Sequence, residues 1–318
     1  MVHPMRYLYL LAAGMATVGT ADKAASAEAA DPLTAAIQLA VAAKWNHAEP
    51  ATRIYGNTYY VGVTGLSSIL IDTGAGLILL DGDLPQSAPL IEANIVQLGF
   101  RVADIKYILN SHAHFDHAGG IAALARDSGA QVFASPSGAA GLRAGHAVPD
   151  DPQAGYAAAG RSDPAIFPKV TSKIHELHDG ETLHLGRISV TAHFTPGHTP
   201  GSTTWTWNDC EQKRCLSIVY ADSLNAIAAP GFHFLGDATH PDLTASFRKS
   251  IRSVDAFPCD ILLTVHPDLA GMPQKLSRQR AGAATNPFID AHACHDYARD
   301  AEALLNARIV EEHKAASH

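Results

Sequence analysis

The stretch Ser111–His117, with the sequence SHAHFDH, holds four residues of metal-binding type within six positions. It follows an apolar run typical of a strand and precedes a helix-like segment. Because alternate residues of an extended chain point to the same side, His112 and His114 share one face. Asp116 and His117 come at the turn into the helix, where they can reach a second point nearby. Imidazole and carboxylate ligands suit zinc, so the stretch predicts a metal site at a strand-to-helix junction.

Two more histidines follow strand-like runs in the same way. His198 lies in the rigid Pro/Gly loop Thr195–Gly201, after the strand-like run 188–194. His266 follows the apolar run 261–265. Short loops at strand ends are where α/β folds place functional side chains. We therefore expect both histidines to join the same metal site.

Other members of the set of 18 histidines have simpler interpretations. His175 and His178 lie near an Asp-Gly turn and are expected on a solvated face. His193 is one residue inside a predicted strand and is expected to pack in the core or behind the site. His292 and His295 flank a cysteine and are expected to be exposed neighbours of a disulfide.

Strand-like and helix-like patterns alternate along the rest of the chain. The strand-like runs are 59–63, 67–71, 76–82, 104–109, 131–134, 188–194, 203–208, 216–221 and 261–265. The helix-like runs are 87–98, 118–126, 243–254, 274–284 and 297–312. This interleaving predicts an α/β fold with sheets covered by helices. Residues 150–170 are aperiodic and rich in Pro, Gly and Ala, as a functional flap would be.

The first 27 residues have the features of a signal peptide. A short region ending in Arg6 precedes an apolar run over 7–18, and Ala25–Ala27 offers a small-x-small cleavage site. The run is shorter than the roughly 20 apolar residues of a membrane span, although a retained anchor is the alternative. We expect export to the periplasm, a single mature domain over 28–318 and no membrane contact after cleavage.

Composition narrows the class of partner. Hydrophobic residues make up 47% and charged residues 17% of the chain, a globular balance. The formal net charge is −8, and lysine and arginine form no run. Phosphate binding needs clustered basic residues, so we expect a small-molecule substrate and no nucleic acid.

The four cysteines fit an exported protein. Cys210 and Cys215 lie between two strand-like runs and could join a hairpin, which would leave Cys259 and Cys294 as a second pair. Spacing alone allows three connectivities, and a reduced, buried role is the alternative.

Together these motifs resemble the metallo-β-lactamase superfamily, whose metal-binding loop reads His-x-His-x-Asp-His. They resemble in particular subclass B3 of the class B β-lactamases, which has no cysteine ligand. The matching stretches include 56–62, 111–120, 195–205, 220–224, 258–260, 266–267 and 286–290. The loop motif identifies only the superfamily, whereas the combination over about residues 55–309 is far more specific.

The resemblance implies an αβ/βα four-layer sandwich with two zinc ions per chain at one edge. His112, His114 and His198 would bind the first ion, and Asp116, His117 and His266 the second. Asp81 would steady the metal-binding loop from behind. The resemblance also supports a disulfide between Cys259 and Cys294, and less generally one between Cys210 and Cys215.

The implied activity is hydrolysis of the β-lactam amide in penicillins, cephalosporins and carbapenems, and with it antibiotic resistance. A hydroxide shared by the zinc ions would attack, Asp116 would orient it, and the three histidines of the first ion would hold the zinc that polarises the carbonyl. Trp45 and the flap are expected at the rim, and we expect a monomer. A lactonase or another hydrolase of the same fold is the alternative, and a periplasmic zinc-binding protein is a further one.

Two positions depart from the family pattern. Ser223 and Asn225 are expected to bind the substrate carboxylate, but the family often has a second serine at the position of Asn225. An amide can still donate a hydrogen bond, so substrate preference is expected to change rather than binding to fail. Asp222 stands where glyoxalase-like relatives carry a metal-bridging aspartate, and the sequence leaves open whether it reaches the metals.

Overall fold

The computed structural model describes residues 30–156, 166–238 and 240–316. Residues 31–318 form one compact unit. The predicted signal peptide lies outside the described residues. Within those residues, none of the helices combines the length and apolar character needed to cross a bilayer.

The first of two sheets has seven strands in sequence order. They are β1 (Thr52–Tyr55), β2 (Thr58–Tyr60), β3 (Ile69–Asp72), β4 (Leu77–Leu80), β5 (Ile105–Leu109), β6 (Gln131–Ala134) and β7 (Ile174–Glu176). The strands from β1 to β4 pair antiparallel, and those from β4 to β7 pair parallel. The carboxyl ends of the parallel strands therefore lie at one edge, where loops can assemble a site.

The second sheet has five strands in the order β12-β11-β10-β9-β8. They are β8 (Thr182–Leu185), β9 (Ile188–Phe194), β10 (Thr203–Glu211), β11 (Arg214–Ala221) and β12 (Ile261–Thr264). The strands from β8 to β11 form an antiparallel meander, and β12 joins parallel to β11.

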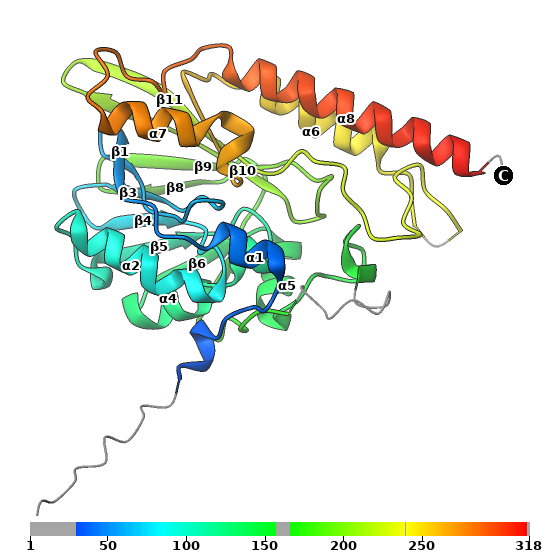
Figure 1. Ribbon diagram of the computed structural model, residues 1–318, viewed down its shortest axis with the longest axis horizontal. Coiled ribbons are helices and arrows are strands. Elements are labelled where there is room, and N and C mark those ends of the chain that lie inside the picture. The colour runs from blue at the N-terminus through cyan, green and yellow to red at the C-terminus, as the bar shows by residue number, and fades with distance from the viewer. Residues whose placement is uncertain (1–29, 157–165, 239, 317–318) are drawn as a thin grey trace, which may run out of the picture. The chain divides into compact units, whose positions relative to one another are not determined.

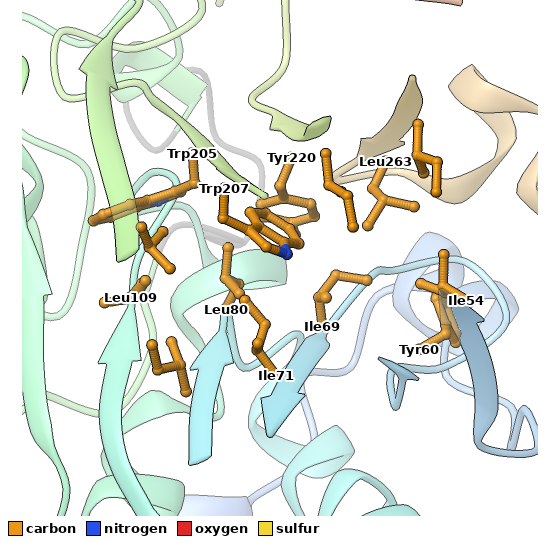
Figure 2. Packing of buried hydrophobic residues seen from close by; sticks show 14 of the residues in the cluster. Ile54, Tyr60, Ile69, Ile71, Leu80, Leu109, Trp205, Trp207, Tyr220 and Leu263 are labelled. Carbon is orange, nitrogen blue, oxygen red and sulfur yellow. The ribbon is translucent and has the colours of Figure 1, made fainter. Parts of the chain in front are cut away.

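The main core lies between the two sheets. Trp205, Trp207 and Tyr220 of the second sheet face Leu80 and Leu109 of the first (Figure 2). On β4 the odd-numbered leucines pack on the opposite side, against the helices. Both faces of this strand are therefore buried, which explains why its sequence is a continuous apolar run rather than an alternating one.

Helices cover the outer face of each sheet (Figure 1). Those packed on the first sheet are α2 (Ala88–Gln97), α4 (Ile121–Ser128) and α5 (Pro136–Ala144). Those packed on the second are α6 (Thr244–Ala256) and α8 (Ala293–Ala316). The remaining helices are α1 (Ala40–Trp45), α3 (Phe115–Ala118) and α7 (Met272–Arg280). The order of layers is helix, sheet, sheet, helix, which confirms the predicted αβ/βα sandwich.

Six of the helices and strands given above were not predicted from the sequence: α1, α3, α5, β1, β7 and β8. Helix α5 is rich in glycine and alanine and lacks a clear apolar period, but Ser135 caps its first turn by accepting a hydrogen bond from Gly138 N–H. The expectation that His175 lies on a solvated face was wrong. It is half-buried on the three-residue strand β7, with its ring stacked on Phe133.

Two disulfide bonds join the pairs that were expected. Cys210 and Cys215 are directly opposite each other on β10 and β11, and their bond closes the hairpin. Cys259 and Cys294 link the segment before β12 to the start of α8. The second bond therefore ties the last helix to the second sheet.

Candidate metal centre

The predicted ligands come together at the carboxyl ends of strands from both sheets. His112 and His114 follow β5, and Asp116 and His117 lie in the short helix α3. His198 follows β9, and His266 follows β12. The six residues form one cluster of five imidazole rings and one carboxylate.

Close packing holds the loop that carries His198. The backbone N–H of Thr203, just after the loop, donates to the carbonyl of Ser111 at 2.9 Å. Gly201 lies against the first turn of α5, where a Cβ atom would come within 2.6 Å of the backbone nitrogen of Gly138. Only glycine allows this approach, which brings the His198 loop up to the end of β5.

Three histidines form the first group. The ring centroid of His112 lies 4.6 Å from that of His114 and 5.0 Å from that of His198, and the last two are 5.1 Å apart. One nitrogen of each ring lies within 4.8 Å of the corresponding nitrogens of the other two. This spacing lets three imidazoles bind a single ion.

The second group surrounds the carboxylate of Asp116. Its Oδ2 atom lies 3.4 Å from Nε2 of His117 and 3.5 Å from Nε2 of His266. The His117 and His266 ring centroids are 4.8 Å apart. His112 also lies beside this group, with its ring centroid 4.5 Å from that of His117. One ligand atom each of His112, Asp116 and His117 lie within 4.8 Å of one another, so a second set of metal-binding donors adjoins the first.

Carboxylates hold two histidines of the first group from behind. His112 donates its Nδ1–H to Oδ1 of Asp222 at 2.6 Å, and His114 donates its Nε2–H to Oδ2 of Asp151 at 3.0 Å. Such partners fix the ring orientation and leave the other nitrogen with its lone pair. The remaining nitrogen of His112, Nε2, is buried and has no hydrogen-bond partner among the described residues. A buried imidazole nitrogen of this kind fits a bound metal ion.

Backbone carbonyls hold two more histidines. His198 donates its Nδ1–H to the carbonyl of Asn225 at 2.9 Å, and Nδ1 of His266 lies 3.3 Å from the carbonyl of Gly65. The Nε2 atom of His198 faces the site, where the amide nitrogen of Gln153 lies 3.4 Å away. Four of the five imidazoles thus have one nitrogen engaged by the protein and the other turned toward the cluster.

Burial sets the protonation state needed for metal binding. It lowers the pKa of His112 and of His117 well below the usual value, and it lowers that of His198 to about 4, with the neighbouring imidazoles adding to the effect. Burial raises the pKa of Asp116, but the surrounding imidazoles outweigh it and the net shift is downward. Burial also opposes protonation of His114, but Asp151 reverses this and raises its pKa. Neutral imidazoles and an ionised carboxylate are the forms that bind metal ions.

Asp81 lies at the end of β4 with a left-handed φ of 58°. Its Oδ1 accepts the backbone N–H of Ser111 at 2.8 Å, and its Oδ2 accepts the hydroxyl of Tyr220 at 2.8 Å. Burial raises the pKa of Asp81 to about 7, although these hydrogen bonds act in the opposite direction. Asp81 therefore contacts the start of the loop that carries His112 and His114.

A pocket of about 380 Å³ opens over the cluster. Besides ligand candidates, its lining includes Trp45, Phe115, Ala147, Gln153, Tyr156, Ser223, Asn225, Ile227, Asp268 and Leu269. Ser223 and Asn225, which are expected to bind the substrate carboxylate, line this pocket, as does Trp45. Within the described residues, no lysine or arginine lines this pocket.

Sequence reasoning missed Asp151 and Gln153 and left the position of Asp222 open. Asp151 and Gln153 belong to the aperiodic segment 150–170, part of which, 157–165, lies outside the described residues. No spacing links Asp151 to His114, so only the folded chain reveals the contact. Asp222 lies behind His112, and its second oxygen, Oδ2, is buried without a partner among the described residues.

The histidines that were expected to lie outside the site do so. His193 is half-buried against Phe257, with Nε2 2.9 Å from the hydroxyl of Thr206. His178 is exposed, as are His292 and His295 beside the second disulfide.

Comparisons with known proteins agree with this geometry. The family model described as the metallo-beta-lactamase superfamily matches residues 51–211. Among solved structures, the Rm3 metallo-beta-lactamase superposes with a TM-score of 0.81 at 44% identity, covering 86% of this chain and 98% of that one. MEM-A1, a subclass B3 metallo-beta-lactamase isolated from a soil metagenome library, has a TM-score of 0.79 at 44% identity, covering 86% of this chain and 100% of that one.

A curated relative matches over a shorter range. The hydroxyacylglutathione hydrolase of Anaeromyxobacter dehalogenans is 34% identical over 102 residues, which are 32% of this chain and 29% of that protein. The chain thus spans less than a third of that relative's length. The family model spans half of the chain, including the loops that carry His112 and His198, and the two solved structures each cover 86% of it. The chain belongs to the metallo-β-lactamase superfamily.

Proposed function

We propose that the protein is a zinc-dependent β-lactamase of the subclass B3 type, which opens the amide bond of penicillins, cephalosporins and carbapenems and so confers antibiotic resistance. The observation that carries the proposal is the cluster of five imidazoles and one carboxylate in the fold of the subclass B3 relatives. Support also comes from the extent of the similarity, since the chain is 44% identical to the Rm3 enzyme and the match covers 98% of that enzyme.

The ligand chemistry supports two zinc ions per chain. The donors are imidazole nitrogens and one carboxylate, and no free cysteine is present among the described residues. His112, His114 and His198 would hold one ion, and Asp116, His117 and His266 the other. Zinc, when bound, supplies hydroxide at neutral pH and acts as a Lewis acid toward a carbonyl oxygen.

The protein's own groups would bind and orient the substrate. The hydroxyl of Ser223 and the side-chain amide of Asn225 line the pocket and can donate hydrogen bonds to the β-lactam carboxylate. Since no lysine or arginine lines the described pocket, hydrogen bonds rather than a salt bridge would fix that carboxylate. Asp116 places Oδ2 beside two imidazoles, and its carboxylate would accept a hydrogen bond from the attacking water and orient it.

The alternative activity is that of another hydrolase on the same fold, such as a lactonase. A curated relative named as a hydroxyacylglutathione hydrolase shares part of the fold, so the metal cluster by itself does not select the substrate. The extent of the match to β-lactamases favours the first proposal. Substrate turnover separates the two.

The test uses the full chain expressed with its own N-terminal segment and purified with zinc. Hydrolysis of a chromogenic cephalosporin, a penicillin and a carbapenem is followed by absorbance, and a panel of lactones is measured in parallel. Turnover of the β-lactams well above that of the lactones supports the proposal. Turnover of lactones alone assigns the alternative.

Location and assembly are part of the same proposal. Two disulfide bonds are compatible with an oxidising compartment, which supports export to the periplasm after cleavage near residue 27. The intact mass of the purified protein would show whether residues 1–27 have been removed, which leaves the proposed single domain 28–318. Light scattering would test whether that domain is a monomer.

A further inference from the structure

The short segment after β11 holds two histidines of the first group at once. The side chain of Asp222 accepts the Nδ1–H of His112 at 2.6 Å, and three residues later the backbone carbonyl of Asn225 accepts the Nδ1–H of His198 at 2.9 Å. A movement of this segment would therefore turn both imidazoles. The segment has left the sheet at this point, so strand pairing does not fix it.

One side chain of α8 fixes this segment. The hydroxyl of Tyr297 donates a hydrogen bond to the carbonyl of Asp222 at 3.0 Å and accepts one from the backbone N–H of Leu224 at 3.0 Å. Tyr297 is buried, and burial raises its pKa above the usual value, so the hydroxyl keeps the proton that it donates. Without this hydroxyl, two buried backbone groups would lose a partner.

Helix α8 is itself anchored on both sides of Tyr297. The disulfide between Cys259 and Cys294 lies one turn before it. Toward the other end, the carboxylate of Glu312 accepts the backbone N–H groups of Phe234 at 2.9 Å and Leu235 at 3.0 Å. The helix therefore gives Tyr297 a fixed position against the second sheet and the loop that follows the segment.

We propose that Tyr297 is a positioning residue for the metal site, because its hydroxyl fixes the segment that aligns His112 and His198. It contacts no ligand candidate directly and acts through Asp222 and Leu224. The inference rests on the proposed metal-dependent function, but not on which substrate is hydrolysed. It assigns a role in metal binding to a helix on the outer face of the second sheet.

The test compares the full chain with Tyr297→Phe, which removes the hydroxyl and keeps the ring. Zinc affinity is measured by competition with a chromophoric chelator, and the cobalt-substituted protein is examined by its visible absorption spectrum. Replacing a direct partner of a metal-bound histidine typically weakens binding by 10- to 100-fold, so we expect about a 3- to 10-fold loss one bond further away. The cobalt spectrum should also shift, because two ligand rings change orientation.

A matched control is available at the far hairpin. Tyr55 is also buried, and its hydroxyl donates to the backbone carbonyl of Arg214 at 2.7 Å. Tyr55→Phe removes one donated hydrogen bond of the same kind, so it should lower the melting temperature while leaving zinc affinity and the cobalt spectrum unchanged. A Tyr297→Phe protein that is folded, binds zinc as tightly as the parent and has the parent cobalt spectrum would overturn the proposal.

A second substitution covers the case in which Tyr297→Phe does not fold. Site-specific 3-fluorotyrosine at position 297 keeps the hydroxyl and changes its hydrogen-bond strength, so a smaller cobalt shift is expected, and an unchanged spectrum would count against the proposal. Both readouts are independent of substrate. A changed zinc affinity together with no β-lactam turnover would keep the role of Tyr297 and reject only the proposed activity.

Discussion

Substituting Asp151 by asparagine tests whether the carboxylate behind His114 is needed for metal binding. The side chain is almost fully buried, and both of its oxygens are used: Oδ2 accepts from His114 at 3.0 Å and Oδ1 accepts from the backbone N–H of Gln153 at 2.8 Å. Asparagine has only one acceptor oxygen, so one of the two hydrogen bonds must be lost. If the amide oxygen still accepts the backbone N–H of Gln153, the amide NH₂ group faces Nε2 of His114. The imidazole then favours the tautomer that carries its proton on Nδ1, and a protonated Nδ1 cannot bind a metal ion.

The expected magnitude follows from the bond that is lost. A hydrogen bond to a charged group contributes about 1.5–3 kcal/mol. Each 1.4 kcal/mol corresponds to a factor of ten, so Asp151→Asn should weaken zinc binding by about 10- to 100-fold. Chelator competition measures this loss, and thermal unfolding shows that the variant is folded.

The neighbouring residue provides the control for this substitution. Asp150 is exposed, and Asp150→Asn makes the same charge change one position away. It should alter zinc affinity by less than about twofold, as expected for an exposed charge screened by water and salt. A folded Asp151→Asn protein that binds zinc as tightly as Asp150→Asn would show that the carboxylate of Asp151 is not needed for metal binding.

Three further predictions concern stability and substrate preference. Replacing Cys259 and Cys294 by alanine opens a loop of about 36 residues and should lower the free energy of unfolding by about 4 kcal/mol, measured by urea denaturation. Two backbone N–H groups and Arg308 lower the pKa of the buried Glu312 carboxyl despite its burial, so its stabilisation is present above the unfolded pKa and is lost as pH falls through the folded one. Glu312→Gln should therefore lower the melting temperature more at pH 7 than at pH 3. Asp268 is an exposed carboxylate in the pocket lining. Asp268→Asn should therefore reduce kcat/KM for cephalosporins with a cationic substituent by about threefold, which is the attraction expected between the carboxylate and a cation about 6 Å away in water.

Each of these predictions has an outcome that contradicts it. A folded variant with alanine at positions 259 and 294 that is as stable as the parent would show that the bond between Cys259 and Cys294 does not restrain the unfolded chain. If Glu312→Gln lowers the melting temperature equally at pH 7 and pH 3, the charge of the Glu312 carboxylate does not stabilise the protein. The same loss of kcat/KM for neutral and cationic cephalosporins would exclude an electrostatic role for Asp268.

The metal-binding loop could be predicted because its ligands are close in sequence. Four of the six ligand candidates lie between positions 112 and 117, and the other two follow strands whose apolar runs are clear. The periodicities also predicted most strands, including β9 at its observed bounds, and therefore the class of fold. Such periodicities predict structure because the apolar residues that form the pattern are also the ones that the strand or helix buries.

The groups that orient the ligands could not be predicted because their partners are distant in sequence. Asp151 is 37 residues from His114, and Asp222 is 110 residues from His112. Tyr297 lies in the predicted helical run 297–312, but its hydroxyl reaches a backbone segment 75 residues earlier. Only the packing of the sheets and of α8 brings these pairs together. Short or weakly patterned elements such as β7 and α5 were missed for the same reason, since tertiary contacts stabilise them.

The central claim is that the clustered histidines hold zinc and that the loaded protein opens β-lactams. The most direct measurement is the rate of β-lactam hydrolysis by the purified full chain, with zinc, with a chelator, and for His112→Ala. We expect fast turnover that is lost with the chelator, restored by zinc and absent in the variant. A folded protein that binds two zinc ions and leaves penicillins, cephalosporins and carbapenems intact would contradict it.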